Sequence, residues 1–247
     1  MSEKAKFFWA GVRAEIPLLI GVFPFGMIYG ALAMDAGLST AAAQMMSSMV
    51  FAGSAQFITT QLVKDSTPGF VIVLTIAVVN LRHMLYSASL APYLASVSTR
   101  WKTLLSYLLT DEAYAPSIIH YEKDGVRPFS HWFLFGAGIA LWTNWQISTA
   151  LGIFLGAAIP DSWSLDFALP LTFIAMVVPV LKNRPAIAAA VSAGLVALAV
   201  YSLPYKLGLI VAAIVGIAVG TFLESKMNLK LENELPIQAN VRRSLDE

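Results

Sequence analysis

Residues 69–95 read GFVIVLTIAVVNLRHMLYSASLAPYLA, an apolar run that is long enough to cross a lipid bilayer. Its centre nevertheless holds Asn80, Arg82 and His83. An arginine at that depth is costly unless it faces protein or water, so we expect it to have a role. As a straight helix the run would measure about 40 Å, against about 30 Å for the hydrocarbon core. We therefore predict that this helix is strongly tilted, or broken at Asn80–His83.

The composition of the whole chain is that of a membrane protein. Of its 247 residues, 57% are hydrophobic and only 13% are charged, whereas soluble domains carry about 25% charged residues. The net charge of +1 without a basic block argues against a nucleic-acid partner. Cysteine is absent and the three histidines lack the spacing of metal ligands, so we expect neither a metal site nor a cofactor.

Hydropathy predicts an all-α, polytopic membrane bundle with about eight spans. We expect a single transmembrane domain over residues 1–223, which begins with a short polar lead over residues 1–15. The expected spans are 16–34, 41–63, 69–95, 101–121, 131–158, 165–181, 186–204 and 207–223. The last three contain few polar residues and are interpreted as a supporting wall. Residues 224–247 form a charged tail that is predicted to be disordered or to lie on a surface.

The distribution of lysine and arginine predicts the orientation. With eight crossings and the N-terminus inside, twelve of the sixteen basic residues lie on the inner side and three on the outer, the remaining one being Arg82. Basic residues favour the cytoplasmic side, so we expect both termini to be cytoplasmic. Arg100 and Lys102 are the exception, and they would be inside if the run 69–95 were re-entrant.

Unusual residues recur at similar depth in several expected spans. These residues are Pro24, Phe25, Gly26, Gln56, Asp111, Glu112 and Asn144. Transporters place their substrate and coupling sites near the midplane, where interrupted helices expose backbone groups. We therefore predict a second helix break at Pro24–Gly26, since proline interrupts helical hydrogen bonding.

Arg82 is expected to form an ion pair with Asp111 or Glu112, because all three lie at similar depth. One arginine cannot neutralise two acids, so the other acid could carry a proton unless His83 is charged. The alternative is a purely structural pair that holds two helices together. Asn80 extends this polar face, and Tyr86 could line the same cavity or simply pack.

Two other function classes stay open at this point. A pore or channel would also use polar residues at the midplane. An intramembrane hydrolase could use Ser54 as the nucleophile and His83 as the base, but the residue after this serine is Ala55 rather than glycine. We therefore expect the protein not to be an enzyme.

Four motifs together resemble a known family. They are FPFG at 23–26, MVFAGSAQF at 49–57, NLRHMLYS at 80–87 and TDEAY at 110–114. In this order they are similar to the AzlC/YgaZ family, the large subunits of bacterial branched-chain amino-acid exporters. The resemblance implies export of valine, leucine or isoleucine across the inner (plasma) membrane. It also implies a small AzlD-like membrane subunit as partner.

An amino acid is a zwitterion, and we predict how the site would hold it. Its carboxylate would bind backbone amides freed around Pro24–Gly26. Its ammonium group would find acceptors in Gln56, Asn144 and freed carbonyls. The apolar side chain would lie near Phe51. One acid of the Asp111–Glu112 pair would carry the coupling proton, with export running against protons.

Overall fold

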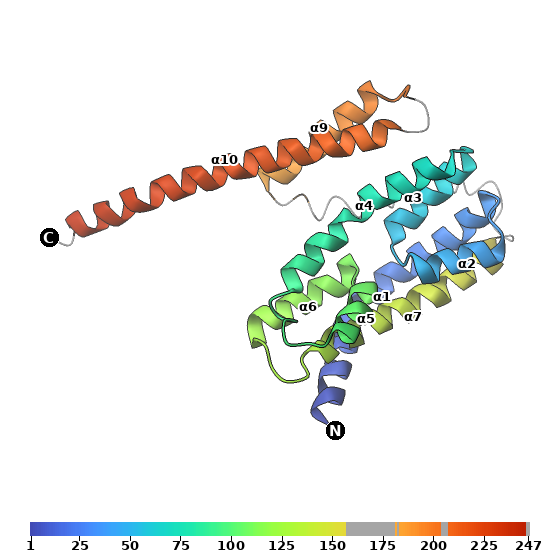
Figure 1. Ribbon diagram of the computed structural model, residues 1–247, viewed down its shortest axis with the longest axis horizontal. Helices are drawn as coiled ribbons and strands as arrows, with labels where there is room; N and C mark the ends of the chain where they lie inside the picture. Colours follow the sequence, from blue (N-terminus) through green and yellow to red (C-terminus); the bar gives the residue numbers. More distant parts are fainter. Residues whose placement is uncertain (157–180, 182, 204–206, 246–247) are drawn as a thin grey trace. The chain divides into compact units, whose positions relative to one another are not determined.

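The computed structural model describes residues 1–156, 181, 183–203 and 207–245, with side chains of the last helix described as far as Met227. Every secondary-structure element in these residues is an α-helix, which confirms the predicted all-α class. The chain divides into two compact units, residues 1–172 and 173–247 (Figure 1). Each unit is described here by itself.

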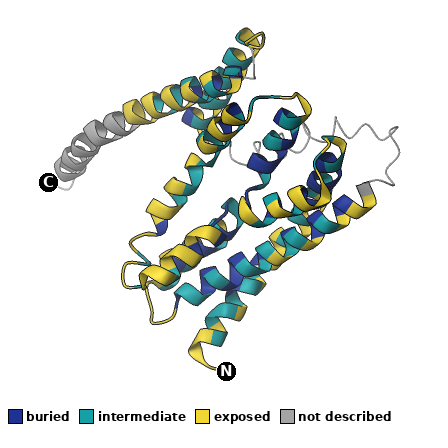
Figure 2. Cartoon of the chain, turned by 45° about the vertical axis from the view of Figure 1, so that its right-hand side comes forward, coloured by how far each residue is buried: buried dark blue, intermediate teal, exposed yellow. Residues whose placement is uncertain are grey.

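The N-terminal unit combines long helices with short ones. In chain order they are α1 (Glu3–Asp35), α2 (Thr40–Met49), α3 (Gly53–Lys64), α4 (Gly69–Leu90), α5 (Thr99–Leu108), α6 (Asp111–Asp124) and α7 (His131–Gly156). Among the described residues, three helices are long and apolar enough to cross a membrane: α1, α4 and residues 207–227 of the C-terminal unit. Figure 2 shows the buried residues of α1 and its neighbours beside largely exposed stretches, as expected for helices that face lipid.

Glycines let α1 and α7 pack in direct backbone contact. A Cβ atom added to Gly136 would lie 2.1 Å from the carbonyl oxygen of Phe8, and one added to Gly152 would lie 2.0 Å from that of Met27. The contact of Phe8 with Gly136 and that of Met27 with Gly152 follow the same order along both helices, so α1 and α7 are parallel. Such close approach through small residues is typical of helices in membranes. We call the end where both helices begin the N-terminal end, and the opposite end the Asp35 end.

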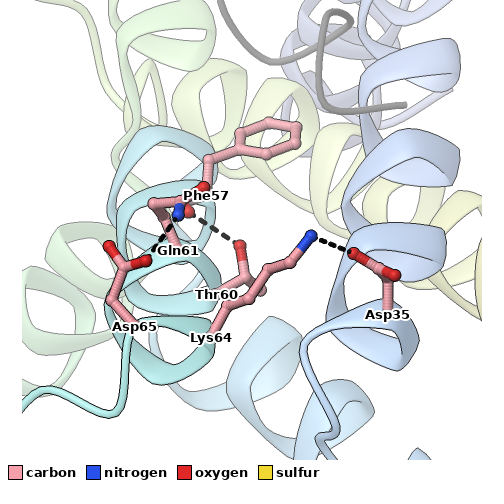
Figure 3. Close-up of polar contacts among 6 residues, drawn as sticks. All are labelled: Asp35, Phe57, Thr60, Gln61, Lys64 and Asp65. Atoms are coloured by element: carbon pink, nitrogen blue, oxygen red, sulfur yellow. Dashed lines mark hydrogen bonds and ion pairs between the residues drawn. The ribbon is translucent and has the colours of Figure 1, made fainter. Parts of the chain in front are cut away.

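Helices α2 and α3 form a hairpin that enters the unit from the Asp35 end and returns to it. Helix α2 begins five residues after Asp35, and Lys64 at the end of α3 places its Nζ 2.8 Å from Asp35 Oδ2. Figure 3 shows this ion pair beside the contacts of Thr60 and Gln61 within α3. We call residues 40–64 the first hairpin.

Helices α5 and α6 form a second hairpin, residues 99–124, at the opposite end. Trp101 near its start packs edge-on against His131 and Trp132 at the start of α7. Tyr121 near its end donates a hydrogen bond to the carbonyl of Ser130. The second hairpin therefore enters from the N-terminal end and returns to it.

These hairpins correct the predicted topology. The expected spans 41–63 and 101–121 fold back on themselves instead of crossing, and the count of eight crossings is not confirmed. Hydropathy sums over a window and does not register a reversal of direction at its centre. The expected span 165–181, apart from residue 181, lies outside the described residues.

Both predicted helix breaks are also wrong. Helix α1 runs continuously through Pro17 and Pro24, and α4 runs continuously through Asn80–His83. Proline is tolerated in a membrane helix where a neighbour packs closely, and α7 packs on α1 at Gly26. Helix α4 ends at Leu90, so its 22 residues span about 33 Å and fit a bilayer without interruption. The chain breaks instead at residues 50–52 and 109–110.

Basic residues of the N-terminal unit segregate strongly under this topology. Lys64 lies at the Asp35 end, whereas Arg100 and Lys102 lie with Arg127 at the N-terminal end. The prediction had placed Lys64 inside and the Arg100–Lys102 pair outside. The hairpin geometry brings Arg100 and Lys102 to the end that holds most basic residues of this unit, and it leaves Lys64 as the exception at the opposite end.

The C-terminal unit contains α9 (Arg184–Ala199) and α10 (Leu207–Leu245). These helices pack through small residues, because a Cβ atom on Gly216 would lie 2.9 Å from that of Ala193, and one on Gly220 would lie 3.1 Å from that of Ala189. Helix α10 continues to Leu245, so the tail that was predicted to be disordered or to lie on a surface is helical, and the expectation of disorder is wrong.

Candidate functional site

Arg82 joins the tips of the two hairpins. From the middle of α4 its Nη1 lies 3.0 Å from Asp111 Oδ2, in the first turn of α6. Its Nη2 donates a hydrogen bond of 2.6 Å to Ser54 Oγ, in the first turn of α3. The ion pair is one of the two expected from the sequence. The bond to Ser54, and the position of both partners at helix N-termini, were not foreseen.

The tip of the first hairpin presents backbone amides. Phe51 is buried and has a φ of +43°, a conformation that costs a bulky residue about 1–3 kcal/mol. Ala52 occupies the N-cap of α3, where no side chain from the described residues accepts a hydrogen bond from the first turn. The positive end of the α3 dipole therefore remains uncompensated by a capping group.

The tip of the second hairpin is capped and acidic. Thr110 Oγ1 accepts a hydrogen bond of 3.4 Å from the amide of Ala113, which caps α6. Asp111 and Glu112 occupy the first turn, where a negative charge is favourable at a helix N-terminus. Asp111 is engaged by Arg82, while Glu112 forms no salt bridge within the part of the chain that the structure describes.

Aromatic residues connect the two tips. Tyr107, at the end of α5, donates a hydrogen bond to the carbonyl of Ser48 at the end of α2, and its ring lies 6.1 Å from that of Phe51. Trp142 of α7 donates to the Tyr107 hydroxyl at 2.7 Å. Trp145, one turn further along α7, donates to Gln56 Oε1 at 2.9 Å. Helix α7 thus forms one wall behind both tips.

Three buried polar atoms on α3 and α4 lack a hydrogen-bond partner among the described residues. They are the donors Arg82 Nε and Gln56 Nε2 and the acceptor Asn80 Oδ1. Buried polar groups are almost always satisfied by protein, water or a ligand. A zwitterion offers acceptors through its carboxylate and donors through its ammonium group, so it complements this set.

The residues predicted from the first span lie in a different setting. Gly26 packs against α7, where an added Cβ atom would lie 1.9 Å from Ser148 Oγ. Pro24 and Phe25 are inside the continuous helix, so the exposed amides expected there are absent. Asn144 donates to the carbonyl of Leu19 at 3.5 Å, within the α1–α7 interface.

The other predicted residues surround Arg82. Tyr86 stacks on Tyr114 at 4.7 Å between ring centroids and lies edge-on to His83 at 6.0 Å. The stacked pair of Tyr86 and Tyr114 ties α4 to α6. The partner of Ser54 is Arg82, whose guanidinium cannot accept a proton, and this arrangement does not support a hydrolase that pairs Ser54 with His83.

Sequence reasoning missed two functional candidates. Glu15 was counted in the polar lead, yet its side chain is completely buried in α1. Tyr107 lies inside the expected span 101–121 and was not singled out, although it links both tips. For Glu15, the apolar stretch that follows directly was the available signal. Among the described residues there is no cluster that could hold a metal ion.

Comparisons with known proteins agree with this membrane architecture. The family model described as AzlC protein matches residues 17–159, more than half of the chain. An uncharacterized membrane protein of Archaeoglobus fulgidus is 31% identical, with 87% of this chain and 94% of that protein covered. The inner membrane protein YgaZ of Escherichia coli is 25% identical, with 86% of this chain and 87% of YgaZ covered. The branched-chain amino acid transport protein AzlC of Bacillus subtilis is 27% identical, with 67% of this chain and 66% of that protein covered. No solved structure matches the chain.

Proposed function

Because this chain belongs to the AzlC family, we propose that it is the large subunit of an exporter for branched-chain amino acids such as valine. The relative named as a branched-chain amino acid transport protein supports the substrate class. The proposed location is the inner membrane, with the N-terminal end facing the cytoplasm. This orientation is supported by the basic residues, which in the N-terminal unit gather at that end. An AzlD-like small membrane subunit is the proposed partner.

The observation that carries the proposal is the position of Arg82 between two helix N-termini. The positive end of α3 and the unpartnered Arg82 Nε can receive a carboxylate in the same place. Helix N-termini that meet at mid-depth are the device by which many transporters bind anionic substrate groups. The apolar side chain of the substrate would lie at the buried ring of Phe51.

Coupling to protons follows from the unequal roles of the two acids. Arg82 engages Asp111, which leaves Glu112 available to hold the ammonium group of the substrate. A proton that neutralises Glu112 removes this partner, so proton and substrate compete. Competition for one site is the simplest basis for exchange, in which protons enter as amino acids leave. In this scheme Glu112 rather than Asp111 is the acid that titrates, because Asp111 is held by Arg82.

A counterflow experiment tests this function. The purified chain is reconstituted in proteoliposomes with and without a small partner subunit, and labelled valine is followed into vesicles preloaded with unlabelled valine. A carrier accumulates label transiently, whereas a channel only equilibrates it. Failure to accumulate label in the presence of the partner contradicts the proposal. Full activity of the chain alone would refute the need for a partner.

Two variants test the assignment of the acids. Glu112→Gln should abolish valine movement driven by a pH gradient and retain counterflow, because the glutamine carbonyl still accepts from an ammonium group. Asp111→Asn should impair both activities, since it leaves Arg82 without its counter-ion. Equal, full gradient-driven export by both variants would show that the carboxylates are structural.

A further inference from the structure

Glu15 is a buried acid for which the described part of the chain offers no hydrogen-bond partner. Its side chain is 0% exposed, and neither carboxylate oxygen has a hydrogen-bond partner within the described residues. The nearby wall of α7 offers no compensation, because residues 132–156 contain no acidic or basic side chain. An isolated ionised carboxylate in such surroundings is prohibitively costly. In this conformation Glu15 is therefore a neutral, protonated acid.

The register between α1 and α6 places Glu15 level with Glu112. The ring of Phe7 lies 5.9 Å from that of His120, and the two helices run in opposite directions at this contact. Glu15 lies eight residues after Phe7 along α1, and Glu112 lies eight residues before His120 along α6. Eight residues of α-helix cover the same rise in both helices, so the two glutamates lie at the same level. Helices α1 and α6 are in contact, so the two carboxyl groups lie on neighbouring helices at the same level.

The other charged groups around this pair are already engaged or point away. On α6, His120 lies two turns from Glu112 and pairs with Asp124 at 3.0 Å. On α1, Arg13 is exposed. On α4, Arg82 is bound to Asp111. Glu112 is thus the acid on the neighbouring helix at the level of Glu15, and no cation forms a salt bridge to either of them in the described residues.

We propose that Glu15 is a second proton-binding residue of the transport cycle, which holds a proton while Glu112 is ionised. This inference rests on the proposed exchange of protons for amino acids. Two facing carboxylates in an apolar interface cannot both be ionised at low cost, so the proton on Glu15 keeps Glu112 free to bind the ammonium group. Transfer of this proton from Glu15 to Glu112 neutralises Glu112 and releases one ammonium group, after which Glu15 takes up the next proton; a glutamine at position 15 cannot supply that proton.

The experiment compares the wild-type chain with Glu15→Gln and with Glu3→Gln as the matched control. Glu3 is an exposed acid of the same helix, 64% accessible, and its replacement should change nothing in either assay. Infrared difference spectroscopy of the purified protein detects the carbonyl band of a protonated carboxyl group. Valine transport in proteoliposomes with the partner subunit is measured both in counterflow and under a pH gradient.

We expect Glu15→Gln to lose the infrared band and the gradient-driven transport while counterflow persists. Glu15→Asp, which keeps a titratable acid, should shift the band rather than remove it. Gradient-driven transport that survives in Glu15→Gln, or a band that is unchanged in this variant, overturns the inference. If the wild type moves no valine, the proposed function fails, but the infrared comparison still decides whether Glu15 binds a proton.

Discussion

The first and second hairpins have nearly the same backbone plan and opposite chemistry at their tips. Their leading helices α2 and α5 both have ten residues, and their returning helices α3 and α6 have 12 and 14. The first tip has an alanine at the N-cap and no charged residue in its first turn. The second has a capping threonine followed by two acids. The two hairpins also enter the N-terminal unit from opposite ends.

In the proposed site, two hairpins of one backbone geometry serve the two ends of a zwitterion. An uncapped helix N-terminus supplies donors, and an acidic first turn supplies acceptors. Arg82 holds the tips at a fixed distance because it bonds to Ser54 and Asp111 at once. Opposed repeats that meet at mid-depth are common in secondary transporters, where one half moves against the other.

The largest effect is expected in a test of whether the two hairpins enter from opposite ends. Labelling of introduced cysteines gives an all-or-none answer. The chain has no cysteine, so single cysteines can be introduced without background. An impermeant thiol reagent should reach Lys102→Cys from the same side as the reference Lys6→Cys. It should reach Lys64→Cys from the other side. The reverse pattern for these two positions would restore two full spans in place of the hairpins.

Removing the link between the tips should have the next largest effect. Arg82→Gln leaves Asp111 without its counter-ion, and we expect a loss of about 3 kcal/mol in unfolding free energy, at the low end for a broken buried pair because both side chains are part exposed. Transport should cease. The double variant with Asp111→Asn should recover part of the stability, as measured by unfolding in detergent. Arg100→Gln is the control. If it lowers the unfolding free energy as much as Arg82→Gln does, the effect is not specific to the link between the tips.

Substitutions at the two N-cap residues, Thr110 of α6 and Ala52 of α3, should have the smallest effect on stability. Thr110→Ala should cost about 1 kcal/mol of stability, the usual value of an N-cap side chain. Ala52→Ser should leave stability equal or slightly higher, because it adds a cap to α3. The same hydroxyl would occupy the amides proposed to bind the carboxylate, so valine affinity should fall. Unchanged binding of labelled valine to Ala52→Ser would place the carboxylate elsewhere.

Much of the site was predictable because it rests on the energetics of single residues. An arginine in an apolar run needs an acid at its own depth, and that requirement alone pointed from Arg82 to the Asp111–Glu112 pair. The choice between the two acids depends on which one faces α4, and this was not predictable. The helix break foreseen at Pro24–Gly26 was wrong, because a proline inside a span can be accommodated by a closely packed neighbour.

The helical class, the membrane environment and the need to neutralise Arg82 could be predicted from the sequence, since they follow from local hydropathy and from the cost of a buried charge. The positions where the helices end, and the direction of the chain after each of them, became known from the tertiary structure. A reversal at residues 50–52 or 109–110 changes neither the composition nor the hydropathy of its window. It is set by contacts between distant segments, such as Lys64 with Asp35 and Trp101 with His131.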